Sequence, residues 1–394
     1  MKQLNKLGNN LIDEGLCNHC LGRQFAKLGY QLENYERGFL VKASNNINKD
    51  IFNNKLIDDK LELGGDCFLC EGIFNKVDLY VDLIKKELQL YKLNSLLIGT
   101  SLTESLKIKE KRLWDKYNNR YSEPLKVELN RLVGKRVLSE LGLIADFKRP
   151  DALALIDIKN DKIKLKSNSM FVYGRYNKYV RGVSQTIWYR DKDVESVEEI
   201  IAEPFIEATQ AKTNKFHGAG REDIDVRCFG GREFVLELIE PKDRIINIKE
   251  VAEKINQKSD IVRIHGVKEA KKDKVREIKE KRSDKLYRAL VKLSDPIDSK
   301  KISKLNEIMG RIKQRTPKRV NHRRSDLIRE RKVLAIFYEK IASEFIEIII
   351  KAEAGLYIKE LISGDEGRTE PSVSQILDCE AVCDKLDVLA IEKK

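Results

Sequence analysis

The chain has 394 residues, of which 41% are hydrophobic, so it is long enough for two or three domains that each bury an apolar interior. Its formal net charge of +13 arises from 76 Lys and Arg against 63 Asp and Glu, and this excess favours a polyanionic partner. No apolar run approaches the roughly 18 to 20 residues that span a bilayer, and residues 1–17 lack the pattern of a secretory signal, so we expect a cytoplasmic protein without a membrane partner.

The N-terminal part contains two CxxC pairs, Cys17–Cys20 and Cys67–Cys70. Four thiolates suit a tetrahedral zinc ion, and a site filled by sulfur leaves no position for water, so the pattern predicts structural zinc. Two unrelated buried or redox-active thiol pairs are the alternative. His19 lies inside the first pair and is a possible substitute ligand. The other cysteines lack such spacing and are expected to be core or surface thiols: Cys228, Cys379 and Cys383.

Apolar spacing predicts an amphipathic helix over Leu21–Gly29, within a zinc-binding region that we place at residues 1–80. Residues 81–192 form the next expected domain, with a helix over Glu123–Leu141 and a strand over Ala152–Ile158.

Near the end of that domain, residues 174–186 combine cationic side chains with tyrosines, a mixture that binds phosphates and stacks on bases. We expect RNA contacts here from Arg175, Tyr176, Lys178 and Arg181. A tyrosine-packed domain edge is the alternative.

Residues 193–394 are expected to form a larger α+β domain, with a strand over Phe234–Ile239 and a helix over Ile248–Gln257. Just before that strand, residues 218–227 read GAGREDIDVR, a glycine-rich turn that holds a carboxylate at a strand end. Its charged side chains are Arg221, Glu222, Asp223 and Asp225, and a hairpin with solvated turn residues is the alternative interpretation.

Two charged tracts follow. Residues 268–285 are expected to be a solvated helix face or a loop. Residues 311–332 hold ten Lys or Arg against two acidic residues, contain Pro317 and have little helical periodicity at first, so we expect a phosphate-contacting arm rather than a plain solvated surface. The cations expected to contact phosphates are Arg315, Lys318, Arg319, Arg323 and Arg324.

The sequence lacks GxxxxGK[ST], a strand-linked GxGxxG and HExxH, so ATP hydrolysis and nicotinamide chemistry lose support. Taken together, six segments resemble the archaeal and eukaryotic tRNA pseudouridine synthase family numbered ten in the Pus nomenclature. These segments are GLCNHCLGRQFAKLG (15–29), CFLCEGIF (67–74), GRYNKYVRGVSQTIW (174–188), FHGAGREDIDVRCFGGREFVLEL (216–238), IKQRTPKRVNHRR (312–324) and AGLYIKELISGDEGRTEPSVSQIL (354–377).

The resemblance implies a multidomain α+β protein. Residues 1–80 would bind zinc, residues 81–192 would be a THUMP-like RNA-binding domain, and residues 193–394 would be the pseudouridine synthase domain, with a mixed, mostly antiparallel sheet flanked by helices. It also implies a monomer that binds tRNA, uses no organic cofactor and modifies position 54, position 55 or both in the T-arm.

By the same resemblance, Asp223 is the catalytic carboxylate, Arg221 is its partner, and Tyr287 and Tyr357 contact the substrate uracil. The carboxylate either attacks C1′ of the ribose or takes a proton from C2′. Around Cys228 the chain departs from the family pattern, because the connection after the aspartate is shorter. A non-catalytic protein that keeps the zinc and THUMP regions and binds or folds tRNA is the main alternative, and a THUMP-bearing thiolase or methyltransferase is a third.

Overall fold

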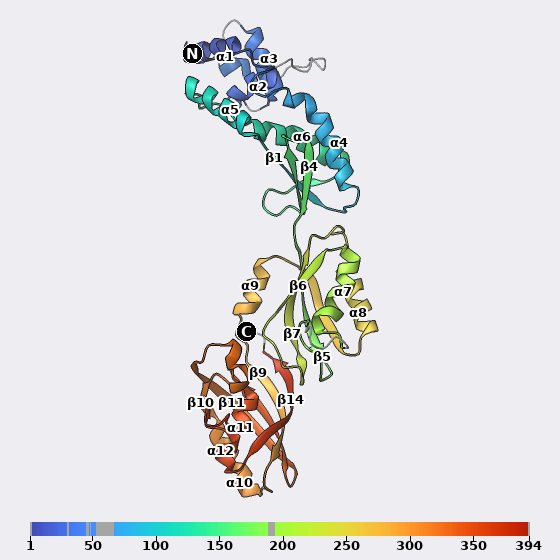
Figure 1. The fold of residues 1–394 in the computed structure, drawn as a ribbon, viewed down its shortest axis with the longest axis vertical. Helices are drawn as coiled ribbons and strands as arrows, with labels where there is room; N and C mark the ends of the chain where they lie inside the picture. The colour runs from blue at the N-terminus through green and yellow to red at the C-terminus, as the bar shows by residue number, and fades with distance from the viewer. Residues whose placement is uncertain are drawn as a thin grey trace. The chain divides into compact units, whose positions relative to one another are not determined.

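The computed structural model describes residues 2–29, 31–44, 47, 49–52, 67–187 and 194–392. These divide into two compact units (Figure 1). The first unit consists of Met1–Asn168 and Lys242–Ile245, and the second consists of Ser169–Pro241 and Ile246–Lys394. Within the described ranges, no helix has the length and apolar character that crossing a membrane requires.

The first unit combines a helical part with a small sheet. Its helices are α1 (Lys2–Asp13), α2 (Asn18–Gly22), η1 (Arg23–Phe25), α3 (Asn34–Ala43), η2 (Lys49–Phe52), η3 (Ile73–Lys76), α4 (Val77–Leu88), α5 (Glu104–Tyr117) and α6 (Leu125–Leu141). Its strands are β1 (Ser95–Ser101), β2 (Ile144–Ala145), β3 (Ala152–Asp157) and β4 (Lys162–Ser167), in the order β2-β1-β3-β4. The helix expected from Glu123 and the strand expected from Ala152 are confirmed as α6 and β3.

The amphipathic helix expected over Leu21–Gly29 is wrong. Helix α2 ends at Gly22 and a 3-10 turn follows. Gly29 has a φ of +71°, and its Cβ would lie 2.4 Å from the carbonyl oxygen of Phe52. A right-handed α-helix cannot continue through this left-handed backbone, so the helical pattern ends before it.

The second unit is built on a ten-stranded sheet in the order β13-β10-β11-β12-β9-β14-β7-β5-β8, with β6 paired to β7. Its strands are β5 (Met170–Lys178), β6 (Thr213–Gly218), β7 (Val226–Ile239), β8 (Val262–Ala270), β9 (Lys285–Leu293), β10 (Gly310–Arg315), β11 (Ile328–Ala342), β12 (Phe345–Ala352), β13 (Thr369–Glu370) and β14 (Ala381–Ile391). Only β14 and β7 pair in parallel among the described strands of this sheet, which confirms the expected mixed, mostly antiparallel sheet.

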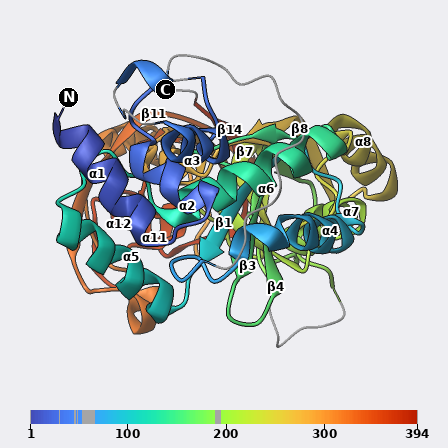
Figure 2. The same cartoon turned by 90° about the horizontal axis from the view of Figure 1, so that it is seen from above.

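Helices accompany both ends of this sheet (Figure 1). They are α7 (Val197–Thr209), α8 (Ile248–Lys258), α9 (Asp273–Glu280), α10 (Ser299–Ser303), η4 (Lys304–Ile308), η5 (Lys318–Arg323), α11 (Ile358–Ser363) and α12 (Val373–Leu377). Figure 2, seen from above, shows α7 and α8 together at one side of the second unit. The helix expected at Ile248 is confirmed as α8, and the charged tract 268–285 contains the solvated helix α9.

Strand β7 joins the two main cores of the second unit. Its first residues, including Cys228, belong to an apolar core with α11 and α12. Its later residues, including Phe234, belong to a second core with α7 and α8. Strand β5, which we expected to precede the catalytic domain, pairs with β7 and β8, so the compact units divide at residue 169 rather than at 193.

Candidate functional site

The four cysteines of the two CxxC pairs converge in the first unit. Their Sγ atoms all lie within 4.8 Å of one another, and all four residues are buried. The Sγ atoms of Cys17 and Cys70 are 3.7 Å apart. Zinc–sulfur bonds of about 2.3 Å in a tetrahedron require sulfur atoms about 3.8 Å apart, so this cluster has the donor set and the spacing of a metal site.

His19 is not part of the cluster, although it lies within the first pair. Its Nδ1 atom lies 2.8 Å from Oε1 of Glu128, and its ring stacks on Phe74 at a centroid distance of 4.5 Å. The possibility that His19 replaces a cysteine is therefore not supported. Outside the cluster, Cys228 is buried and the two C-terminal cysteines are partly buried, as expected of core and surface thiols.

The second unit contains a cleft of about 1090 Å³. It gathers residues from the glycine-rich turn before β7, from β9, from the basic arm and from the start of α11. Six of the residues predicted from the sequence line this cleft: Arg221, Asp223, Tyr287, Arg319, Arg324 and Tyr357. Segments more than a hundred residues apart in the chain thus meet at one place.

Asp223 lies in the cleft between two cations. Nη1 of Arg319 is 3.0 Å from Oδ2 of Asp223, and Nζ of Lys359 is 3.6 Å from the same oxygen. Lys359 also contacts Oδ2 of Asp225 at 2.7 Å. Although burial opposes the effect, the hydrogen bond from Lys359 lowers the pKa of Asp225.

Arg221 does not form the ion pair with Asp223 that we expected. Its side chain is exposed on the cleft, and no ion pair of Arg221 occurs among the described residues. Arg319 and Lys359 occupy that role instead. Of these, Lys359 was not predicted, although its position two residues after Tyr357 in the AGLYIKEL segment was a usable signal.

A buried polar network holds the turn that carries Asp223. Nε of Arg232 lies 2.7 Å from Oε2 of Glu222, with 3% and 1% of their side chains exposed. The hydroxyl of Tyr176 donates to Oε1 of Glu222 at 2.8 Å and accepts a 2.7 Å hydrogen bond from Gln185. Gln185 also donates to the carbonyl oxygen of Gly220, whose φ is +82°. Burial and the charge of Glu222 raise the pKa of Tyr176.

Lys178 binds the backbone of the same turn. Its ammonium group is buried and donates to the carbonyl oxygens of Val183 at 2.7 Å and of Asp223 and Ile224 at 3.2 Å each. Burial lowers the pKa of Lys178. Neither Lys178 nor Tyr176 reaches solvent, so the structure gives these two expected RNA contacts a supporting role.

The two arginines predicted in the same segment are held by carboxylates. Arg175 contacts Glu233 at 2.8 Å, and Arg181 contacts Asp387 at 2.6 Å. Both guanidinium groups are partly buried in these pairs. These arginines are therefore engaged in ion pairs with carboxylates on strands β7 and β14 of the sheet.

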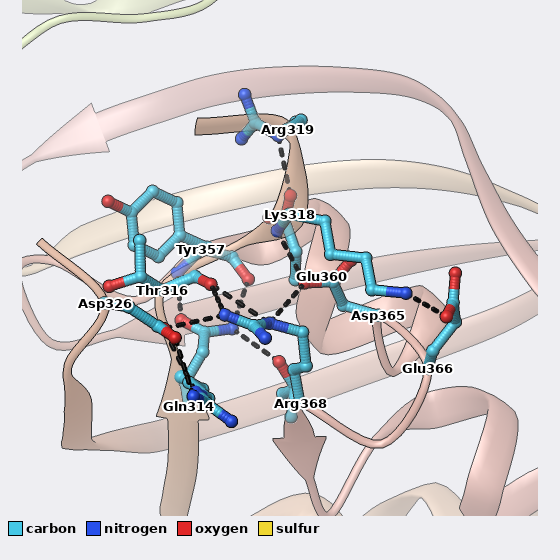
Figure 3. Close-up of polar contacts among 12 residues, drawn as sticks. Gln314, Thr316, Lys318, Arg319, Asp326, Tyr357, Glu360, Asp365, Glu366 and Arg368 are labelled. Atoms are coloured by element: carbon cyan, nitrogen blue, oxygen red, sulfur yellow. Dashed lines mark hydrogen bonds and ion pairs between the residues drawn. The ribbon is translucent and has the colours of Figure 1, made fainter. Parts of the chain in front are cut away.

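The two predicted tyrosines border the cleft from different elements. Tyr287 lies on β9, and burial raises its pKa to about 12. Tyr357 precedes α11, and Gln314 fixes its backbone through hydrogen bonds of 2.8 and 3.0 Å (Figure 3). Arg324 donates to the Tyr357 hydroxyl at 3.0 Å. Lys285, which we did not predict, also lines the cleft, and burial together with Arg232 lowers its pKa to about 8.

The basic arm is ordered by carboxylates rather than irregular (Figure 3). This arm, residues 311–332, contains all of β10 except Gly310, the 3-10 turn η5 and the start of β11. Arg315 pairs with Asp326 at 2.7 Å, and Lys318 pairs with Glu366. The side chain of Arg323 lies outside the described part of the structure.

Comparison with known proteins identifies what the chain is similar to. The family described as "Pus10, C-terminal" matches residues 171–392, and "Pus10 THUMP domain, archaeal" matches residues 80–157. The protein named tRNA pseudouridine synthase Pus10 of Pyrococcus furiosus is 37% identical over 391 residues, covering 98% of this chain and 97% of that protein. The proteins of the same name from Methanothermobacter marburgensis and Methanocaldococcus jannaschii are 39% and 40% identical, covering 97% and 95% of this chain and 96% and 92% of those proteins.

Proposed function

The chain belongs to the Pus10 family of tRNA pseudouridine synthases, which are isomerases, and we propose that it converts uridine to pseudouridine at position 54, position 55 or both in the T-arm of tRNA. The observation that carries this proposal is the placement of Asp223. Its carboxylate lies in a cleft of sufficient size for a nucleotide and next to two cations. Two tyrosines line the same cleft.

The isomerisation breaks the bond between N1 of uracil and C1′ of ribose and forms a bond between C5 and C1′. The proton on C5 is lost and N1 gains a proton, so the reaction is neither an oxidation nor a reduction. We propose that Asp223 begins it, either by attacking C1′ or by accepting a proton from C2′. Arg319 and Lys359 compensate the negative charge of this carboxylate within hydrogen-bonding or ion-pairing distance.

The target base must leave its stack before the carboxylate can reach the ribose. Tyr287 and Tyr357 line the cleft from β9 and from the start of α11, and we propose that their rings contact the uracil. Arg324, which donates to the Tyr357 hydroxyl, fixes one of these rings. Phosphate contacts are proposed for the exposed cations of the arm, Arg315, Lys318 and Arg324.

We also propose that the cysteine cluster binds structural zinc. Four sulfur donors leave no position for a reacting water, and the cluster belongs to a different unit from the cleft. Burial raises the pKa of the Cys20 thiol, so a bound cation would be needed for this group to be a thiolate near neutral pH. The zinc would stabilise the first unit and takes no part in the isomerisation.

The test is the substitution Asp223→Asn with Asp225→Asn as the matched control. Both changes remove one negative charge from the same turn, and both aspartates contact Lys359. We expect Asp223→Asn to abolish pseudouridine formation in a T-arm transcript while tRNA affinity changes less than about tenfold, or roughly 1.4 kcal/mol. Asp225→Asn should retain pseudouridine formation at a reduced rate. Mass-spectrometric mapping of the transcript reports both the activity and the position.

Two outcomes would redirect the assignment. Activity retained in Asp223→Asn would refute the role of this carboxylate. A wild-type protein that binds tRNA but forms no pseudouridine would support the alternative of a non-catalytic tRNA-binding protein.

A further inference from the structure

Arg319 belongs to the basic arm, but its guanidinium group contacts two carboxylates, Asp223 in the cleft and the buried Glu360. Nη1 lies 3.0 Å from Oδ2 of Asp223, and Nε donates to Oε1 of Glu360 at 2.6 Å. From this geometry, and on the basis of the function proposed above, we infer that Arg319 is a positioning residue for Asp223 and that Glu360 fixes Arg319 for this purpose.

Glu360 is a buried carboxylate that requires a nearby cation. Only 6% of its side chain is exposed, and its Oε2 atom is buried without a hydrogen-bond partner in the part of the chain that the structure describes. A buried carboxylate is costly unless a cation is close. Arg319 supplies that cation, and although burial opposes the effect, Glu360 and Asp223 together raise the pKa of Arg319.

The backbone that carries Arg319 is fixed independently of the side chain (Figure 3). The N–H group of Lys318 donates to Oδ2 of Asp365 at 3.0 Å. Arg368 donates to the carbonyl oxygen of Thr316 at 2.6 Å and contacts Asp326 at 2.7 Å. Arg319 is therefore presented to Asp223 from a defined place on the arm, as an orienting group must be.

The start of helix α11 completes the arrangement because its N-cap residue and its first turn supply three contacts. Tyr357 borders the cleft, Lys359 approaches Asp223 and Asp225, and Glu360 holds Arg319. Two cations thus reach Oδ2 of Asp223 from different elements, one directly from α11 and one from the arm. Loss of either cation would leave the Asp223 carboxylate in contact with only the other of these two cations.

A positioning role differs measurably from the phosphate contact that the sequence predicts for Arg319. A phosphate contact contributes to tRNA affinity and to its salt dependence. A positioning contact contributes to the rate of conversion when tRNA is saturating, because misplacing a reacting group by about 1 Å can cost about 10²-fold in rate.

The experiment measures the single-turnover rate at saturating tRNA and the tRNA dissociation constant for Arg319→Gln, Arg319→Lys and Glu360→Gln. We expect Arg319→Gln to lower the rate by about 10- to 100-fold with a dissociation constant within about threefold of wild type. Arg319→Lys should recover part of the rate, because an ammonium group restores the charge but not the paired geometry. Glu360→Gln should lower the rate although Glu360 is nearly buried and acts on Asp223 only through Arg319.

The double variant gives the sharpest readout. If Glu360 acts through Arg319, the rate losses of Arg319→Gln and Glu360→Gln should combine to less than their product. Lys318→Gln is the comparison within the arm, and its effect should appear in the dissociation constant and the salt slope. Arg276→Gln on the solvated helix α9 is the control for loss of a surface cation, since 82% of its side chain is exposed.

Thermal unfolding of each variant separates loss of fold from loss of orientation. An unchanged saturated rate in folded Arg319→Gln, with weakened affinity, would overturn the inference in favour of a phosphate contact. Full multiplication of the two rate losses would also overturn it. If wild-type protein forms no pseudouridine, or if Asp223→Asn retains activity, the proposed function fails instead, so the two failures are distinguishable.

Discussion

The substitution Glu222→Gln should destabilise the second unit and loosen the turn that carries Asp223. Glu222 is the acceptor for Tyr176 and the ion-pair partner of Arg232, with Arg232 Nε 2.7 Å from Oε2. Neither side chain of the ion pair is exposed by more than 3%. Glutamine preserves the shape of the side chain but leaves the guanidinium group of Arg232 without a counter-charge.

The magnitude follows from this burial. Removing one partner of a buried ion pair costs about 3 to 5 kcal/mol, because the remaining charge has been taken out of water without compensation. For a unit of roughly 150 to 250 residues, each kcal/mol lowers Tm by about 2 to 4 °C, so the expected decrease is about 6 to 20 °C. Replacing both partners by apolar residues should cost less than the sum of the two single changes.

Urea unfolding and thermal unfolding measure this cost, and Glu280→Gln is the matched control. Glu280 also pairs with an arginine Nε at 2.7 Å, but 64% of its side chain is exposed. Exposed pairs on a helix contribute about 0.3 to 0.5 kcal/mol, so the control should be nearly neutral. A cost for Glu222→Gln no larger than that of the control would refute the assignment of Glu222 and Arg232 as the anchor of the turn.

Two further predictions concern metal and pH. We expect metal analysis to find one zinc ion per chain. The substitution Cys67→Ser should lower both the zinc content and the Tm of the first unit. An unchanged Tm after full loss of zinc would contradict a structural role for the metal. At Asp387, burial opposes ionisation, but hydrogen bonds from Arg227 and Arg288 hold the pKa at about 2, below the unfolded value of 3.8. This carboxylate should therefore contribute about 2 kcal/mol above roughly pH 4 and lose that contribution as the pH falls through 2. In urea unfolding from pH 6 to pH 2, the deficit of Asp387→Asn should shrink toward low pH, and a constant deficit would exclude this linkage.

Local patterns in the sequence predicted the elements whose signal is local. The apolar spacing of α6, the alternation of β3 and the periodicity of α8 each require only neighbouring residues. The two CxxC pairs predicted their own convergence, because thiol pairs at metal-ligand spacing have few other uses. These features did not depend on the order of strands in the sheet.

The supporting role of Lys178 depended on that order and was missed. Its partners are carbonyl oxygens of residues 223 and 224, which come near only because β5 pairs with β7. Composition alone makes an alternating basic and aromatic segment resemble an RNA-binding surface. In an internal strand the same residues instead bury their charge against a turn that lies far along the chain.

The expected pair of Arg221 and Asp223 failed for a related reason, and the structure gives a better account of why the turn has this sequence. Glu222 lies between them in the wall of the same cleft and is buried against Arg232 and Tyr176. Because Arg232 and Tyr176 anchor Glu222, the backbone of the turn is fixed next to Asp223, whose carboxylate reaches Arg319 and Lys359 in the cleft. Its counter-charges must then come from other elements, Arg319 and Lys359. A buried carboxylate next to Asp223 in the chain therefore fixes the turn that carries the carboxylate proposed to react.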